Sequence, residues 1–248
     1  MSKDSDFLID LVKKANVLIT DDLIIKAKDN EGDLVTNFDY EIEKYMIERI
    51  KEKYPGFTIV SEEFNENNKL TDNCFTIDPI DGTVNFSNGL PLWGIQVACI
   101  KNSQTIASVI YLPRLNELYY ADESGAYLNN KKIHVNDYGI NRGMYTVTAK
   151  DAIIGEIKMR ELNKNNCNFC ACINFAWVAA GRLSGTMFRK DSLWDYIPGQ
   201  FLVKQAGGVI YNESGSHVAA NNKEFLETLK ERASFNKYEE VKIVKKNN

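Results

Sequence analysis

The sequence predicts a mixed α/β fold: an α+β first half, residues 1–140, and an α/β second half, residues 141–248, forming one compact unit. Two observations indicate this. Short apolar runs typical of strands dominate the middle of the first half, whereas in the second half such runs alternate with segments of helical periodicity. The length of 248 residues, with 44% hydrophobic and 26% charged residues, suits one large core or two halves that share one.

The first half is expected to begin with helices and to continue with strands. Segment 6–20 mixes apolar and charged residues as an amphipathic helix does, unlike a signal peptide. Segment 39–53 has apolar residues at 42, 45, 46 and 50, and this helix is expected to end at Pro55. Asn129-Asn130-Lys131-Lys132 is expected to form a hairpin turn, because asparagine tolerates positive φ. The predicted strands of this half are 57–60, 74–77, 93–100, 105–112 and 117–121.

The second half lacks a Pro- or Gly-rich linker to the first, and the chain has no internal repeat. Its apolar runs and helical periods predict alternating elements. The expected strands are 145–149, 168–173 and 209–211, and the expected helices are 151–162, 174–184, 196–206 and 221–232.

Bulk composition excludes several classes of function. A net charge of −4 argues against a dedicated nucleic-acid binder, whose surface would be basic. No apolar run approaches the roughly 18 residues that a membrane-spanning helix needs. Five cysteines cannot all pair, and no secretory segment precedes them, so we expect a reducing cytoplasm.

The most informative segment is Cys74-Phe75-Thr76-Ile77-Asp78-Pro79-Ile80-Asp81-Gly82-Thr83. A buried strand over 74–77 would deliver Asp78 and Asp81 in a turn that Pro79 stiffens and Gly82 makes pliable. Two carboxylates this close repel each other unless a cation lies between them. Oxygen ligands favour a hard ion such as Mg2+, so the segment predicts a metal site and phosphate chemistry.

Two other segments place carboxylates at the ends of predicted elements. Glu62 and Glu63 follow the strand at 57–60, and Asp195 precedes an apolar helix. Because proline fits best in the first turn of a helix, Pro198 places that helix start near Asp195. On its own, Asp195 is better explained as an N-cap than as a metal ligand.

Taken together, these segments resemble the inositol monophosphatase family of Mg2+-dependent, lithium-sensitive phosphatases. The resemblance covers residues 28 to 230 and implies a layered α-β-α-β-α sandwich of the inositol monophosphatase and fructose-1,6-bisphosphatase type, and a homodimer. It is carried, in family order, by Asp33-Leu34-Val35-Thr36-Asn37-Phe38-Asp39, Val60-Ser61-Glu62-Glu63, Asp78-Pro79-Ile80-Asp81-Gly82-Thr83, Gly125-Ala126-Tyr127-Leu128-Asn129, Trp194-Asp195, Gln205-Ala206-Gly207-Gly208 and Val218-Ala219-Ala220-Asn221-Asn222.

The resemblance implies metal ligands. Glu62, Asp78 and the backbone carbonyl of Ile80 would hold a first Mg2+ ion. Asp78, Asp81 and Asp195 would hold a second, and a third, weaker ion would rest largely on Glu62 and waters.

The resemblance also implies catalytic and phosphate-binding roles. Thr83, with Asp39 behind it, would orient and deprotonate the attacking water. Lys28 matches the family's lysine near the site, although Lys26 competes for that role. The backbone N–H groups of Gly82 and Thr83, if they open a short helix, would bind phosphate together with the metal-bearing Asp81 and Asp195.

Some residues that could bind a metal are also explained without one. Glu63 is explained equally well as a solvated residue, or one that holds a ligand in place, and as a metal ligand itself. Cys167, Cys170 and Cys172 have a C-x2-C-x-C spacing that suggests zinc, but this spacing lacks a second ligand pair. We therefore interpret residues 168–173 as a strand with reduced, half-buried thiols.

Substrate recognition departs from the family pattern. Inositol-specific members have Gly-Ser-Ala-Ala where this chain has Phe169-Cys170-Ala171-Cys172, and a polyol-binding glutamate where it has Phe188. Phenylalanine accepts no hydrogen bond from a polyol, and Arg182, Arg189 and Lys190 are candidates for binding a second phosphate. We predict hydrolysis of a small phosphate monoester. Fructose-1,6-bisphosphatase or 3′(2′),5′-bisphosphate nucleotidase activity is one alternative, and a non-catalytic partner-binding regulator is another.

Overall fold

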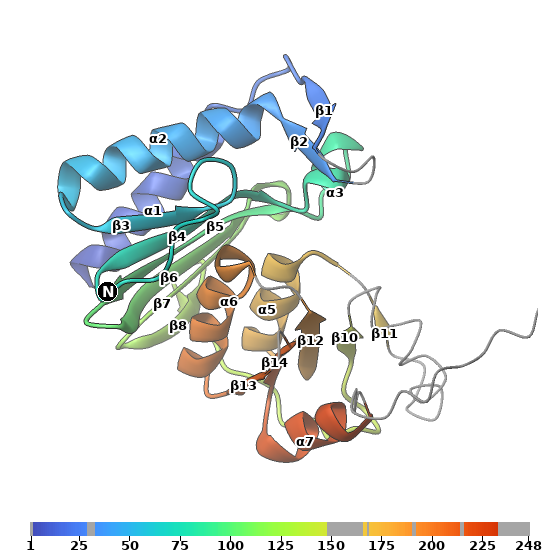
Figure 1. Cartoon of the computed structure of the whole chain (residues 1–248). Coiled ribbons are helices and arrows are strands. Elements are labelled where there is room, and N and C mark those ends of the chain that lie inside the picture. The colour runs from blue at the N-terminus through green and yellow to red at the C-terminus, as the bar shows by residue number, and fades with distance from the viewer. Residues whose placement is uncertain are drawn as a thin grey trace, which may run out of the picture.

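The computed structural model describes residues 2–28, 33–147, 166–167, 169–189, 192–213 and 216–232. Figure 1 shows these residues stacked as α-β-α-β-α, with helices outside a large sheet, helices between the two sheets, and a helix beyond the smaller sheet. The layered fold that the resemblance implied is confirmed. The predicted helix at 151–162 lies outside the described residues.

The large sheet has seven strands within the described residues, in the order β3-β4-β5-β6-β7-β8-β9. In this described sheet only β3 and β4 pair in parallel, and the other neighbouring strands are antiparallel. Asn129 and Asn130 have φ values of 48° and 67° and form the two-residue turn between β8 and β9, as predicted. The strands are β3 (Thr58–Ser61), β4 (Cys74–Asp81), β5 (Gly94–Lys101), β6 (Gln104–Leu112), β7 (Glu117–Asp122), β8 (Gly125–Leu128) and β9 (Lys131–Lys132).

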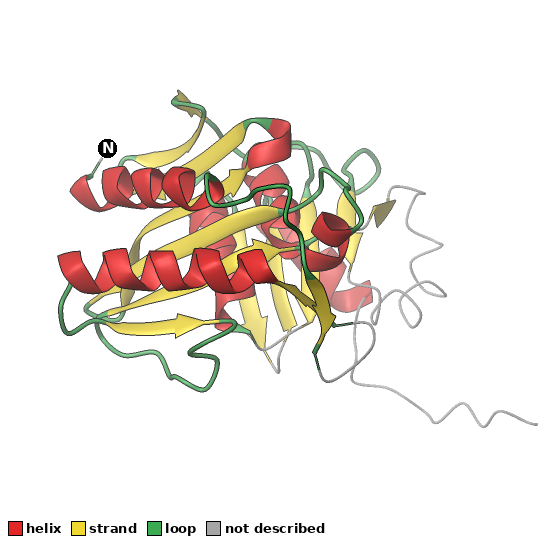
Figure 2. Ribbon diagram, turned by 90° about the horizontal axis from the view of Figure 1, so that it is seen from above, coloured by secondary structure: helices red, strands yellow, loops and turns green. Residues whose placement is uncertain are grey.

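Helices α1 (Lys3–Asn16) and α2 (Asn37–Lys53) cover one face of this sheet and lie next to each other, as Figure 2 shows. Their apolar stripes are buried against it, for example at Leu8, Ile42 and Met46. A short hairpin of β1 (Ile25–Ala27) and β2 (Leu34–Thr36) leads into α2. No helix of the described part combines the length and apolarity needed to cross a bilayer.

The central layer consists of α5 (Ala171–Ala179) and α6 (Leu193–Gln205), which contact both sheets. The smaller sheet has the order β11-β10-β12-β14-β13, and α7 (Lys223–Arg232) packs on its outer face. Its strands are β10 (Tyr145–Val147), β11 (Asn166–Cys167), β12 (Gly185–Arg189), β13 (Val209–Glu213) and β14 (Ser216–Ala220), and two short helices complete the elements, α3 (Thr83–Ser87) and the 3-10 helix η1 (Pro113–Leu115). Because the central helices contact both sheets, the division at residue 140 stays a prediction.

The strand predicted over 168–173 is wrong, because α5 begins at Ala171 and ends at Ala179. All residues of α5 except Trp177 are buried, so the helix is buried on nearly every side and has no amphipathic period to distinguish it from a strand. The helix predicted at 174–184 is therefore α5, which begins and ends earlier in the chain than predicted. Strand β12 occupies residues for which we predicted neither a helix nor a strand.

Helix α6 begins at Leu193, near Asp195 as expected, but Pro198 does not lie in its first turn. Pro198 is the sixth residue of α6, where the missing N–H removes one i→i−4 hydrogen bond. The N-cap is Ser192, so Asp195 lies inside the first turn and is not the N-cap.

Asp122, at the end of β7, connects the start of α1 to the large sheet through hydrogen bonds. Its Oδ2 accepts hydrogen bonds from Ser2 N (2.7 Å) and Ser5 Oγ (3.0 Å), and its Oδ1 accepts one from Ser124 N (2.9 Å). Burial alone would raise the pKa of Asp122, but the hydrogen bonds from Ser124, Ser2 and Ser5 outweigh it and lower the pKa to about 2. The carboxylate form is therefore the one that stabilises the fold.

We expect Asp122→Asn to lower the free energy of unfolding by about 1.5–3 kcal/mol at pH 7, the usual range for hydrogen bonds to a charged group. The ordinary pKa of this group is 3.8 and the folded value is about 2. The contribution of the carboxylate is therefore full above pH about 4 and is lost as the pH falls from 4 to 2. Urea unfolding of both proteins between pH 2.5 and pH 7 measures this.

Asp72→Asn is the matched control, since the exposed Asp72 accepts a hydrogen bond from exposed Ser103 and its loss should cost less than about 0.5 kcal/mol. A difference between Asp122→Asn and the parent that stayed constant down to pH 2.5 would show that the charge of Asp122 is not what stabilises this contact.

Candidate metal and active site

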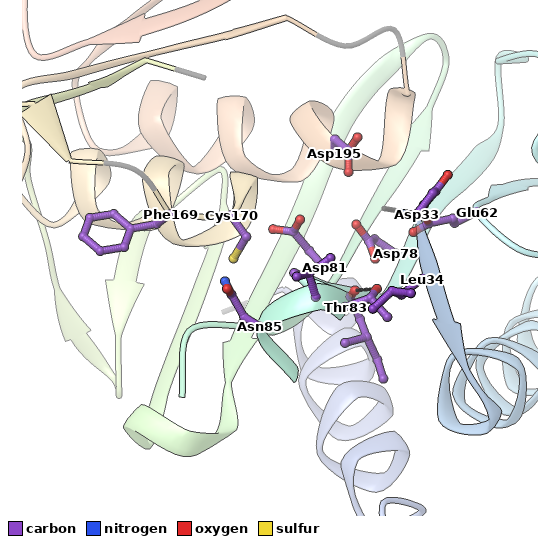
Figure 3. Close-up of a pocket in the computed structure, with 13 residues that line it drawn as sticks. Asp33, Leu34, Glu62, Asp78, Asp81, Thr83, Asn85, Phe169, Cys170 and Asp195 are labelled. Carbon is purple, nitrogen blue, oxygen red and sulfur yellow. Dashed lines mark hydrogen bonds between the residues drawn. The ribbon is translucent and has the colours of Figure 1, made fainter. Parts of the chain in front are cut away.

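One cavity of about 430 Å³ opens where β4 ends, next to α3 and the first turns of α5 and α6. Its size is ordinary for a small-molecule site. Figure 3 shows carboxylates from three separate segments, Glu62, Asp78 with Asp81, and Asp195, around this space. The lining residues are Asp33, Leu34, Glu62, Asp78, Ile80, Asp81, Gly82, Thr83, Val84, Asn85, Phe169, Cys170 and Asp195.

Strand β4 continues through Asp81, four residues farther than predicted, and carries both of its aspartates. Asp78 pairs with Gln96 and Asp81 with Gly94, so the register shifts by one residue between them and β4 bulges. A bulge tolerates Pro79, which has no N–H to donate to the neighbouring strand. The expected turn is thus a bulge, and it brings Asp78 and Asp81 to the same cavity.

Other residues hold these two carboxylates in place. Asp78 has no exposed surface, and Gln96 Nε2 donates a hydrogen bond to its Oδ2 at 3.3 Å. The backbone N–H of Cys172, at the start of α5, donates to Asp81 Oδ2 at 2.5 Å. The fold therefore positions each aspartate from a neighbouring element.

Asp195 enters the cavity from α6 and is only 3% exposed. The next residue, Tyr196, stacks on His217 of β14 with ring centroids 3.6 Å apart, which ties the first turn of α6 to the smaller sheet. One carboxylate oxygen from each of Asp78, Asp81 and Asp195 lies within 4.8 Å of the others. Three anionic oxygen donors at this separation fit a hard divalent cation, so the cluster is a candidate metal site.

Glu62 lines the same cavity, and hydrogen bonds to Glu43 hold the turn that carries it. Glu43 of α2 accepts hydrogen bonds from Ser61 Oγ (2.5 Å), Glu63 N (2.7 Å) and Phe64 N (2.8 Å), which fixes the turn after β3. Burial raises the pKa of Glu43 despite these bonds. The sequence analysis did not single out Glu43, although a glutamate four residues after Asp39 on the buried face of a helix could have indicated it.

Lys28 contacts the acidic pair after β3. Its Nζ is 3.1 Å from Glu62 Oε1 and 2.6 Å from Glu63 Oε1. Burial opposes the charge of Lys28, but Glu62 and Glu63 raise its pKa. The side chain of Glu63 is 4% exposed, so it is not the solvated residue that we considered, and burial raises its pKa to about 7 although Lys28 opposes this. Lys26, the competing lysine, is exposed on β1.

Thr83 and Asp39 are adjacent, as the resemblance implied. Thr83 Oγ1 lies 2.9 Å from the Ile80 carbonyl oxygen and 3.3 Å from Asp39 Oδ1. Asp39 Oδ2 accepts hydrogen bonds from Thr36 N (2.7 Å) and Thr36 Oγ1 (2.6 Å), the capping box of α2. Burial raises the pKa of Asp39 to about 6 in spite of these bonds. One oxygen of Asp39 thus caps the helix while the other faces Thr83.

Gly82 is the N-cap of the short helix α3 and has a φ of 91°. This left-handed conformation favours glycine, and a Cβ here would lie 3.0 Å from the Leu92 carbonyl and 3.1 Å from Cys170 Cβ. The predicted helix start at Gly82 and Thr83 is confirmed, and it faces the cavity.

Of the cations considered for a second phosphate, Arg182 is engaged elsewhere. Its guanidinium forms two hydrogen bonds with Glu117, at 2.7 and 3.0 Å, and Arg182 is not among the described residues that line the cavity. The expectation that Arg182 binds a second phosphate is therefore wrong. Lys190 and the side chains of Phe188 and Arg189 lie outside what the structure describes. Phe169 does line the cavity.

Comparison with known proteins identifies the family. Residues 6–245 match the model of the inositol monophosphatase family. The chain is 31% identical over 237 residues, 89% of each chain, to a protein of Thermotoga maritima called fructose-1,6-bisphosphatase/inositol-1-monophosphatase. It is also 31% identical over 210 residues to the Nus factor SuhB of Escherichia coli, covering 80% of this chain and 79% of that one.

A solved structure of a Thermotoga maritima IMPase superposes with a TM-score of 0.81 at 26% identity, covering 94% of this chain and 96% of the other. The sequence match, the shared fold and the carboxylate cluster agree, and the chain belongs to the inositol monophosphatase family.

Proposed function

We propose that this protein is a Mg2+-dependent phosphatase that hydrolyses a small phosphate monoester by attack of a water molecule. Membership of the family indicates a phosphatase. The observation that carries the proposal is the approach of the Asp78, Asp81 and Asp195 carboxylates to within 4.8 Å inside a cavity that Glu62 also lines. A binding surface has no need for several desolvated carboxylates at one point, because each is costly to bury without a cation.

The residues that would hold the metal are those that line the cavity. Asp78, Asp81 and Asp195 form one oxygen set, and Glu62, Asp78 and the carbonyl of Ile80 form a second that shares Asp78. Bound Mg2+ supplies Lewis-acid stabilisation of the attacking and leaving oxygens. Two ions would neutralise the total charge of −4 on the four carboxylates, so assembly of the site depends on the metal.

In our proposal Thr83 and Asp39 handle the proton of the attacking water. The Thr83 hydroxyl has one proton and two acceptors within reach, the Ile80 carbonyl and Asp39 Oδ1. When the proton points to Asp39, the Thr83 oxygen accepts a hydrogen bond from water and orients its lone pair. Transfer of the water proton to Thr83, with transfer of the Thr83 proton to Asp39, produces the nucleophile. Burial of Asp39, which raises its pKa to about 6, suits it to receive a proton near neutral pH.

The helix start at Gly82 and Thr83 would orient the phosphate. Gly82 and Thr83 line the cavity at the positive end of α3, where phosphate oxygens would be favourably placed. Lys28 lies behind Glu62 and would act by fixing that carboxylate.

The substrate class follows from what faces the cavity. Phe169 lines it where inositol-specific members have glycine, and Phe188 replaces a polyol-binding glutamate in sequence. Both changes weaken recognition of inositol hydroxyls and leave phosphate chemistry intact. A sugar bisphosphate is therefore the second candidate substrate, and it is supported by the double name of the Thermotoga maritima relative.

Phosphate release is the direct test. We expect Mg2+-dependent release from at least one of inositol 1-phosphate, fructose 1,6-bisphosphate and adenosine 3′,5′-bisphosphate, abolished by EDTA and inhibited by lithium. Comparison of kcat/KM between the three identifies the substrate class. Activity on none, with Mg2+ bound, would contradict the enzymatic proposal. It would favour a regulator of the kind that the SuhB relatives' name, Nus factor, indicates.

Two further expectations stay predictions. The resemblance implies a homodimer, which light scattering on the eluting protein would measure. The cysteine content led us to expect a cytoplasmic location, which cell fractionation would measure.

A further inference from the structure

Two thiols lie beside the phosphatase site and take no part in the mechanism above. Cys170 and Cys172, at the start of α5, have their Sγ atoms 3.5 Å apart, and both are free thiols. Cys170 lines the cavity and Cys172 is fully buried behind it. Figure 3 shows Cys170 and Asp81 on the same side of the cavity.

The two sulfur atoms and a carboxylate oxygen of Asp81 lie within 4.8 Å of one another. The main chain maintains this arrangement, because Cys172 N donates a hydrogen bond to Asp81 Oδ2. Two glycines leave room for the sulfurs: a Cβ on Gly82 would lie 3.2 Å from Cys170 Sγ, and one on Gly94 would lie 2.9 Å from Cys172 Sγ. The thiols and the carboxylate therefore converge because of the backbone around them.

From this geometry we infer that Asp81, Cys170 and Cys172 form a second metal site, selective for a soft or borderline divalent ion such as Zn2+. Thiolate sulfur selects Zn2+ over Mg2+, and two sulfurs and one carboxylate oxygen are ligands that Zn2+ accepts in a tetrahedral arrangement. Three protein ligands leave the fourth position open. Binding releases the two thiol protons to solvent as the sulfurs become thiolates.

Because this site shares Asp81 with the proposed Mg2+ site, bound Zn2+ should affect phosphatase activity. This consequence rests on the proposed function. Asp81 cannot serve the Zn2+ site and the Mg2+ site independently, so each ion should weaken binding of the other by the same factor. We therefore expect Zn2+ to inhibit Mg2+-dependent phosphate release, with inhibition moving to higher Zn2+ concentrations as Mg2+ is raised. The sequence spacing alone does not reveal this site, because the third ligand comes from β4, about 90 positions earlier in the chain.

The first experiment measures binding without reference to activity. Co2+ replaces Zn2+ at thiolate sites and then gives thiolate-to-cobalt charge-transfer absorption. In Mg2+-free buffer that contains a phosphine reductant, we expect added Co2+ to produce this band in the parent protein, and Zn2+ to displace it. Absence of the band in the folded parent protein would overturn the inference.

The matched variants are Cys170→Ser with Cys172→Ala, and Cys74→Ala with Cys99→Ala. The first pair restores the residues that inositol-specific family members carry, so we expect it to fold. The second removes two buried thiols of the large sheet. We expect the first pair to lose the cobalt band and to weaken Zn2+ binding beyond the roughly 10–100-fold that loss of an outer-shell partner costs. The second pair should match the parent.

Inhibition is then compared within each protein, relative to its own activity without Zn2+. Equal inhibition of the parent and the Cys170→Ser, Cys172→Ala protein would place Zn2+ at the carboxylates alone and overturn the proposed site. If no protein hydrolyses any phosphate ester, the cobalt spectra still decide the metal site, so its failure and that of the proposed function are distinguishable.

Discussion

Asp195→Asn is expected to reduce kcat for phosphate release by more than about 100-fold, the upper range for loss of even an outer-shell partner of a metal. Asparagine is nearly isosteric but has no charge. The set of carboxylate oxygens within 4.8 Å then loses one of its three anions, and the remaining pair attracts a divalent cation less strongly. Calorimetric Mg2+ titration and steady-state kinetics measure both effects.

The same substitution should leave the metal-free protein as stable as the parent or more stable. Asp78 and Asp195 are buried near Asp81, and their mutual repulsion is relieved when one becomes neutral. A gain of 1 kcal/mol raises Tm by roughly 2–4 °C in a domain of this size. With Mg2+ the order should reverse, since binding stabilises the parent more. Thermal unfolding in EDTA and in Mg2+ compares the two.

Asp33→Asn is the matched control for this pair of effects. Asp33 lines the same cavity but is not in the three-aspartate cluster. If Asp33→Asn lowered kcat and Mg2+ affinity as much as Asp195→Asn, the general negative potential of the cavity would explain the result, and the specific ligand role of Asp195 would be wrong.

The sequence allowed the positions of Glu62, Asp78 and Asp81 to be predicted because each follows a strongly patterned strand. Strands β5, β6 and β7 have long apolar runs, and the asparagine pair at 129 and 130 specifies its own turn. A cation site at Asp78 and Asp81 could be predicted because the two residues lie in one short segment of the sequence. Asp195 required the resemblance, because its neighbours in the sequence alone favour a helix cap over a metal ligand.

Other features depend on tertiary contacts that no local pattern contains. Helix α5 is buried on nearly all sides, so its apolar residues lack the period that distinguishes a helix from a strand. The contacts of Lys28 with Glu62 and Glu63 join residues 34 and 35 positions apart. The hydrogen bond from Cys172 N to Asp81 joins residues 91 positions apart and brings both thiols to the cavity. Such pairings arise from packing of the layers.

Thr83→Ala is expected to lower kcat by about 10²–10⁴-fold, the usual contribution of positioned proton transfer, while Mg2+ affinity and KM change little. The substitution removes a hydroxyl that lies 2.9 Å from the Ile80 carbonyl and 3.3 Å from Asp39 Oδ1 and leaves every carboxylate of the cavity in place. The lost hydrogen bond should cost about 1 kcal/mol of stability, too little to unfold the protein. Steady-state kinetics with calorimetric Mg2+ titration separates the chemical step from metal binding.

Three variants separate the proton-transfer role of this pair from its structural role. Thr83→Ser keeps the hydroxyl and should retain most of the activity. Asp39→Asn keeps an oxygen for the capping box but accepts protons poorly, so kcat should fall with little loss of stability. Thr36→Ala breaks the capping box itself and should cost about 0.5–2 kcal/mol of stability with a smaller effect on kcat. If the loss of kcat followed the loss of stability across all three, Asp39 would serve only to cap α2, and the water would have to lose its proton elsewhere.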